Sequence, residues 1–132
     1  MPKNMSESFR TFGAAQKNVQ WSVSAWTPDD SLVVTLWAHH YRRGPSGTAE
    51  YASTVDRPWD GAGKNEFVAN VQRAFDEKRP VRLIVVTASD PTRVEAGDNV
   101  NALPKTFDPK VNQIGEVVSF DGNAYVFRFR PI

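Results

Sequence analysis

The sequence predicts a single α+β domain in which a mostly antiparallel, curved sheet or partly open barrel carries one packed helix. Three observations lead to this class. Residues 59–90 read as a glycine-containing turn, an amphipathic helix and an apolar strand. Three segments before them read as strands, and a later Asp-Gly turn joins two more. The expected order of elements is therefore βββ-α-β-ββ.

The helix is indicated by an apolar stripe at helical spacing. Its members are Phe67, Val68, Val71, Ala74 and Phe75. We expect the helix to begin near Gly63, because Glu66 three residues later can reach back to the free amides of the first turn. Pro80 should end it, since proline has no amide hydrogen to donate and restrains the residue before it.

The strand after the helix, residues 81–86, is apolar and loses its alternation beyond Leu83. Such a run is typical of a strand whose two faces are both covered by other elements. The apolar stripe of the helix is the expected cover for one of these faces.

Two strands are expected before the helix as a hairpin, followed by a third. Residues 20–26 alternate in polarity, which predicts a strand. Residues 31–42 form a long second strand, and the intervening Pro28-Asp29-Asp30 predicts the turn between them. Residues 48–55 are of mixed polarity, so we expect them to form an edge strand.

The last two strands follow a long polar connection that begins after Val86 and passes Glu95 and Pro104. Loops of this length inside compact domains are often functional. Residues 111–120 and 124–130 then form two strands, and the Asp-Gly turn between them is the strongest hairpin signal in the chain.

The chain has 132 residues, enough for one domain with a substantial core. We expect residues 19–132 to form that domain. Residues 1–18 are predicted to be a disordered or loosely docked segment, in which Phe9 and Phe12 could contact the body of the domain or a partner.

Composition and charge argue against several classes of protein. The absence of cysteine removes disulfides, cysteine zinc sites and thiol nucleophiles. The formal net charge of +1 gives no bulk positive field, so any nucleic-acid binding needs a local patch. Without an apolar run near the ~20 residues of a membrane span, and without an apolar signal core, we expect a cytoplasmic protein with no membrane partner.

Two motif-like groups are interpreted as structural. Gly61-Ala62-Gly63-Lys64 is not a phosphate loop, because that loop needs a glycine where Pro58 stands and a hydroxyl where Asn65 stands. The free amides of residues 61–64 could still hold a lone anion. Asp29-Asp30 follows a proline in a predicted turn, where aspartates usually bond to nearby amides.

The two histidines do not predict a metal site. His39 and His40 are adjacent on an expected strand, so their side chains should point to opposite faces. They also belong to a different hairpin from Ser89, the serine next to an acid, so no hydrolase arrangement is visible. We therefore predict no catalytic residue, no metal ligand and no cofactor.

What remains is arginine interleaved with aromatic residues. Arginine binds phosphate bidentately and stacks on bases, and aromatic rings are platforms for unpaired or flipped bases. The main hypothesis is a non-enzymatic nucleic-acid-binding domain, DNA favoured, that holds a strand or reads a base in an aromatic pocket. The predicted contact residues are Trp37, Tyr41, Arg42, Arg43, Arg57, Trp59, Arg128 and Arg130.

Other interpretations stay open. The Arg128 face could equally pair with Glu50 or Glu116 across the sheet. The chain could be a protein-interaction or oligomerising module that uses the edge strand at residues 48–55 or the Phe9 and Phe12 segment. A small-ligand pocket is a third hypothesis, and an enzyme is not favoured. The pocket would be lined by Trp21, Trp26, Trp37 and Phe127.

Overall fold

The computed structural model of the chain describes residues 4–18, 22–56, 61–95 and 104–132. The strands are β1 (Ser24–Trp26), β2 (Leu32–Trp37), β3 (Tyr41–Arg43), β4 (Ala49–Thr54), β5 (Val81–Ala88), β6 (Lys105–Pro109), β7 (Gln113–Phe120) and β8 (Ala124–Pro131). The helices are α1 (Met5–Thr11), α2 (Ala62–Glu77) and α3 (Pro91–Glu95), with short 3-10 turns η1 (Ala38–His40) and η2 (Pro45–Gly47).

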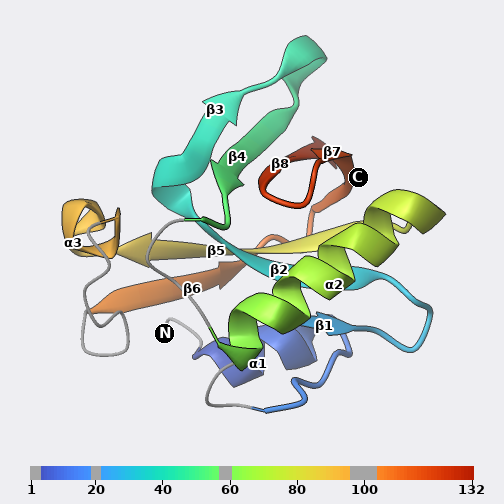
Figure 1. Cartoon of the computed structure of the whole chain (residues 1–132), viewed down its shortest axis with the longest axis horizontal. Coiled ribbons are helices and arrows are strands. Elements are labelled where there is room, and N and C mark those ends of the chain that lie inside the picture. The colour runs from blue at the N-terminus through green and yellow to red at the C-terminus, as the bar shows by residue number, and fades with distance from the viewer. Residues whose placement is uncertain (1–3, 19–21, 57–60, 96–103) are drawn as a thin grey trace.

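The strands form one open sheet in the order β1-β2-β5-β7-β8-β4-β3, with β6 paired to β5 outside that path (Figure 1). Among the described strands, β2 and β5 run parallel and the other pairs are antiparallel. The predicted class, an α+β domain with a mostly antiparallel, unclosed sheet and a packed helix, is confirmed. The hairpins predicted from the Pro-Asp-Asp and Asp-Gly turns are β1–β2 and β7–β8.

Strand β5 is covered on both faces, as its unbroken apolar run predicts. On one side Leu83 packs in the main core with Phe67 and Val71 of α2. On the other side Ile84 packs in a second cluster with Phe9 of α1 and Val33 of β2. In Figure 1 α2 lies across the front of the sheet, while α1 lies at its lower edge.

Helix α1 lies within the segment predicted to be disordered or loosely docked. The Asn4 side chain accepts a hydrogen bond from the Glu7 amide at 2.8 Å, and the Glu7 carboxylate accepts one from the Asn4 amide at 3.3 Å. This capping box satisfies two amides of the first turn. Phe9 is only 1% exposed, so it holds α1 against the body, one of the two roles that the sequence suggests for it.

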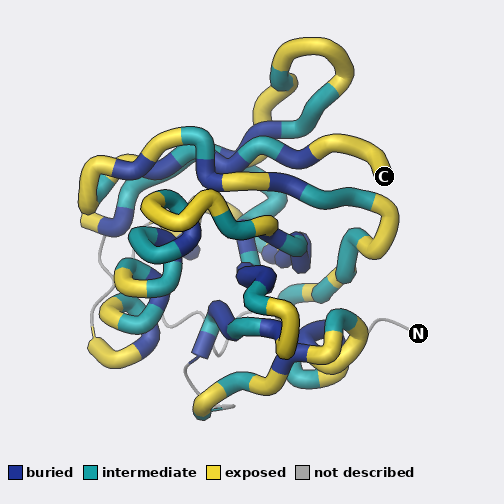
Figure 2. The backbone as a smooth tube through the Cα atoms, turned by 90° about the vertical axis from the view of Figure 1, so that its right-hand side faces the viewer, coloured by how far each residue is buried: buried dark blue, intermediate teal, exposed yellow. Residues whose placement is uncertain are grey.

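The long strand predicted over residues 31–42 is interrupted. β2 ends at Trp37, the 3-10 turn η1 follows, and β3 begins at Tyr41. Residues 37–41 read Trp-Ala-His-His-Tyr and contain no glycine or proline, so the sequence gives no sign of the break. As a result β3 leaves the line of β2 and forms the β3–β4 hairpin, which projects from the body in Figure 1 and has an exposed tip in Figure 2.

The prediction of an edge strand at residues 48–55 is wrong. β4 pairs with β3 on one side and with β8 on the other, so it lies inside the sheet. Its mixed polarity has a different cause, because Glu50 is a buried carboxylate with arginine partners on both neighbouring strands. The strand at this end of the sheet is β3.

Helix α2 begins at Ala62, one residue before the predicted start near Gly63. Its N-cap is Gly61, with φ of 94°, a conformation that favours glycine. The helix ends at Glu77, and Lys78 adopts the left-handed conformation as C-cap, so that Pro80 lies just beyond it. The polar connection after β5 also contains two short elements that the sequence does not predict, α3 and β6.

Candidate functional site

One charged row crosses four neighbouring strands. Arg42 of β3 is opposite Glu50 of β4, Glu50 is opposite Arg128 of β8, and Arg128 is opposite Glu116 of β7. Directly opposed residues share one face of a sheet. Arg130 lies two residues beyond Arg128 and is therefore on the same face. We call these five residues the arginine face.

Glu50 is the centre of this face and is only 6% exposed. Its Oε1 accepts a hydrogen bond from Arg42 Nε at 2.9 Å, and its Oε2 accepts one from Arg128 Nε at 2.8 Å. Arg128 Nη2 completes the ion pair at 2.7 Å from Oε2. Hydrogen bonds from Arg128 first and from Arg42 second lower the pKa of the Glu50 carboxyl below its ordinary range. The open interpretation that Arg128 pairs across the sheet with Glu50 is therefore correct.

The two paired arginines are oriented but still reach solvent. The Arg42 side chain is 55% exposed and that of Arg128 is 34% exposed. Each arginine donates a hydrogen bond from its Nε to Glu50, and this bond fixes the plane of the guanidinium. Arg130 is exposed, and within the described residues it makes no ion pair. The face thus carries three arginines and two glutamates.

The other predicted contact residues are not on this face. Tyr41 and Arg43 point to the opposite side of β3, where Tyr41 is 49% exposed and its ring lies 5.8 Å from that of Tyr51. Trp37 packs against Ala88 and Val94. The remaining two residues, Arg57 and Trp59, lie outside the described residues. The fold thus brings together Arg42, Arg128 and Arg130, but not the predicted set as a whole.

The residues predicted to line a ligand pocket are not gathered in one place. Phe127 is fully buried in the main core. Trp26 is opposite Leu32 at the start of β2, where its Nε1 donates to Asn70 Oδ1 at 2.9 Å, whereas Trp37 is at the other end of β2. Trp21 lies outside the described residues.

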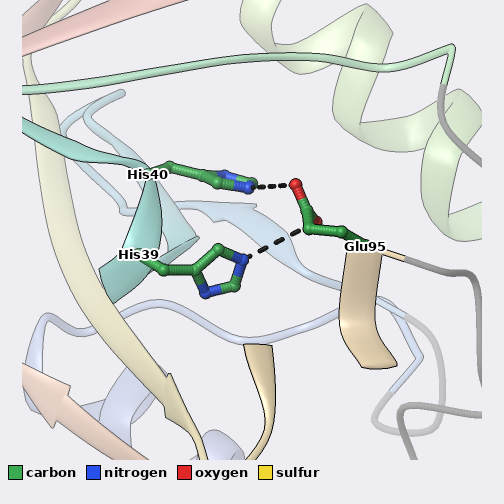
Figure 3. A group of neighbouring side chains, drawn as sticks. All are labelled: His39, His40 and Glu95. Atoms are coloured by element: carbon green, nitrogen blue, oxygen red, sulfur yellow. Dashed lines mark hydrogen bonds and ion pairs between the residues drawn. The ribbon is translucent and has the colours of Figure 1, made fainter. Parts of the chain in front are cut away.

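A second cluster, unpredicted, lies where η1 meets α3 (Figure 3). His40 Nε2 is 3.0 Å from Glu95 Oε1, and His39 Nε2 is 3.6 Å from Glu95 Oε2. The sequence predicts that the two histidines point to opposite faces of a strand, and this prediction is wrong. They lie in a 3-10 turn, so both side chains turn toward Glu95.

Contacts with partly buried and buried side chains hold this cluster in place. The His39 ring lies 4.5 Å from the His40 ring and 5.8 Å from the Trp37 ring, measured between centroids. Val94 is 6% exposed and packs with Ala88 and Trp37, which positions Glu95 immediately after it. The histidine side chains are 20% and 7% exposed, while that of Glu95 is 45% exposed and opens the cluster to solvent.

The sequence holds a signal for α3 that would have placed Glu95. Asp90 precedes Pro91, and aspartate at the N-cap followed by proline at the first position is a helix-start pattern. The Arg93 amide donates to Asp90 Oδ1 at 3.3 Å, in agreement with that pattern. No sequence pattern indicates that a turn would bring the histidines to this helix.

Three comparisons with known proteins return no relative. No protein-family model matches the chain, and searches of curated proteins and of solved structures likewise find no match. Among the described helices none has the length and apolar character needed to cross a membrane.

Proposed function

We propose that the chain is a non-enzymatic nucleic-acid-binding domain, with DNA favoured, that contacts its ligand through the arginine face and the projecting β3–β4 hairpin. The observation that carries the proposal is the clasp of Arg42 and Arg128 by the buried Glu50. Arg42 is held through Nε and keeps both terminal amino groups for a phosphate, whereas Arg128 also uses Nη2 and keeps Nη1. A guanidinium fixed in this way loses less side-chain freedom on binding.

The arginine face leaves positive charge exposed for contact with a phosphate. Glu50 is enclosed by its two partners, whereas Arg130 is exposed at the end of β8. Arg43, on the other side of β3, makes no ion pair within the described part of the chain. A nucleic-acid backbone that passes over the β3–β4 hairpin would thus contact arginines on both faces of the hairpin. This local positive charge compensates for the low net charge of +1 of the chain.

Tyr41 supplies the aromatic part of the proposal. Its exposed ring is supported by Tyr51 and stands beside Arg43 on the hairpin. Stacking of one base on an aromatic ring is worth about 1–3 kcal/mol and is tolerant of sequence. We therefore propose that bases stack on Tyr41, in place of the enclosed aromatic pocket that the sequence suggests.

The test is fluorescence anisotropy with labelled single-stranded DNA, duplex DNA and single-stranded RNA over a salt series. Binding should weaken steeply with salt. Arg43→Gln and Arg130→Gln should each weaken binding and lower the salt slope by about one for each lost phosphate contact. Arg79→Gln is the control, because the Arg79 side chain is 38% exposed and pairs with Glu77 at the end of α2, away from the arginine face. Absence of binding at low salt would overturn the proposal.

Binding of a protein partner is a second candidate function, at a different surface from the two that the sequence suggests. Phe9 is buried, Phe12 is partly buried and β4 is internal, so the two predicted docking elements offer little free surface. One of the two strands at the ends of the described sheet order is β3, whose three residues are all exposed. An extended peptide or a second chain could add to this edge. Sedimentation velocity over a concentration series tests self-association, and a mass that stays monomeric contradicts it.

A further inference from the structure

We propose that His39, His40 and Glu95 form a binding site for a divalent first-row transition-metal ion, with Zn²⁺ favoured. This inference uses the second cluster alone and is independent of the proposed nucleic-acid function. One ligand atom from each residue can be chosen so that the three lie within 4.8 Å of one another. Figure 3 shows both imidazole rings directed at the Glu95 carboxylate.

The spacing suits a shared ion. Two ligand atoms bound to a tetrahedral Zn²⁺ at its usual bond lengths are about 3.3 Å apart. The separations of 3.0 Å and 3.6 Å from the histidine Nε2 atoms to the Glu95 oxygens lie on either side of that value. The two histidine–carboxylate separations are therefore compatible with ligands of one shared ion.

The His39 ring nitrogens favour metal coordination because they lack hydrogen-bond partners among the described residues. Both of its ring nitrogens are inaccessible to solvent, and neither has a hydrogen-bond partner within the described residues. A buried polar atom without a partner is costly and rare in native proteins. A metal bond to Nε2 would satisfy one of these nitrogens, whereas the 3.6 Å separation from Glu95 is too long for a hydrogen bond.

The ligand types identify the class of ion. Imidazole nitrogens suit zinc, copper, nickel and iron, while magnesium and calcium prefer sites made wholly of oxygen. Two histidines and one carboxylate are a known combination for zinc with a fourth position left open. The 45% exposure of Glu95 leaves room for water or an external ligand at that position.

Bound metal would also connect two parts of the fold. His40 and Glu95 are 55 positions apart, on η1 and at the end of α3. Metal that binds only the folded state raises the temperature of unfolding by mass action. We thus expect Zn²⁺ to stabilise the protein, and Mg²⁺ at the same concentration to have no comparable effect.

The experiment begins with full-length, chelator-treated protein, freed of chelator and titrated with Co²⁺ by visible absorption and with Zn²⁺ by calorimetry. We expect one equivalent to bind, with ligand-field bands for Co²⁺ and quenching of the nearby Trp37 fluorescence. The chain has only two histidines, so imidazole resonances in NMR spectra report the site directly. Both ring systems should shift on addition of Zn²⁺.

Three variants test the ligands one by one. Glu95→Gln, His39→Ala and His40→Ala should each weaken Zn²⁺ binding by at least about tenfold, the lower limit found even for outer-shell residues. Glu95→Gln is the decisive variant, because the Glu95 side chain is half-exposed and glutamine is nearly isosteric with glutamate. The circular dichroism spectrum should therefore show that the fold is kept. Glu116→Gln, an exposed carboxylate of β7, is the matched control.

Two results would overturn the proposal. One is wild-type protein that shows no Co²⁺ bands and no Zn²⁺ heat, which would reduce the cluster to an ion pair between His40 and Glu95. The other is Zn²⁺ binding that Glu95→Gln leaves unchanged, which would place the ion elsewhere.

Discussion

The Arg128 guanidinium is held by a single carboxylate oxygen of Glu50, which accepts a hydrogen bond from Nε at 2.8 Å and lies 2.7 Å from Nη2. The other oxygen of Glu50 accepts from Arg42, so one buried acid fixes two basic side chains on neighbouring strands. These residues come together only when the sheet is folded. The strength of the two ion pairs should depend on pH, because they need an ionised Glu50 carboxylate.

Acid should weaken the fold in part through Glu50. Its carboxyl pKa is lowered from its ordinary value of 4.5 in the folded state, so its stabilising effect is present above that value and is lost as pH falls through the folded pKa. Glu50→Gln removes this titration. We expect the difference in urea midpoint between wild type and Glu50→Gln to be largest near neutral pH and to shrink below pH 4.5. A difference that stays constant with pH would contradict the assignment.

Removal of the Phe9 ring should destabilise the whole domain. Phe9 is 1% exposed and fills the second cluster against Val33 and Ile84. Truncation of a buried phenylalanine costs about 3–5 kcal/mol, so Phe9→Ala should lower the free energy of unfolding by that amount in urea denaturation. Phe12→Ala is the control, because Phe12 is only partly buried and should cost less. Equal effects would contradict the docking of α1.

Gly115→Ala should be destabilising for a steric reason. A Cβ at this position would lie 2.4 Å from the Arg128 carbonyl oxygen and 2.4 Å from Cδ1 of the buried Phe129. Overpacking typically costs about 1–3 kcal/mol, and a backbone atom cannot move aside as a flexible side chain can. Thermal unfolding should show the loss, while Ser119→Ala on the exposed part of β7 should have little effect.

Asn70 should matter because it connects α2 to β1 twice. Its Oδ1 accepts from Trp26 Nε1 at 2.9 Å, and its Nδ2 donates to Ser24 Oγ at 2.9 Å. At about 1 kcal/mol for each hydrogen bond, Asn70→Ala should cost about 2 kcal/mol in chemical denaturation. Asn70→Asp keeps an acceptor for both partners, since the serine hydroxyl can donate, and should cost less. A larger loss for the aspartate variant would contradict this account.

The fold class was predictable because strong periodic signals coincide with the largest buried elements. The α2 stripe and the unbroken apolar run of β5 account for much of the main core. The prediction of an edge strand at residues 48–55 failed because it depends on which strands pair. Glu50 gives β4 a mixed polarity typical of an edge, yet its partners Arg42 and Arg128 are 8 and 78 positions away.

The second cluster shows a different limit. Residues 37–41 contain no glycine, no proline and no turn dipeptide, so they do not reveal where β2 ends. The position of Glu95 depends in turn on the burial of Val94 against Trp37 and Ala88. These packing contacts join segments that are far apart in the chain, and no local pattern of residue types specifies them. Sequence reasoning could name the histidines, but it could not find their acid.

The position of β5, covered on both faces and paired to β2, β6 and β7, sets the order in which backbone amides should exchange with deuterated water. Amides at the centre of β5, such as those of Leu83 and Val85, should exchange only when the entire molecule unfolds. Those of the projecting β3–β4 hairpin should exchange through local opening, many times faster. Ligands held by the hairpin would thus bind the part of the domain that opens most readily, while the central strand keeps its protection throughout.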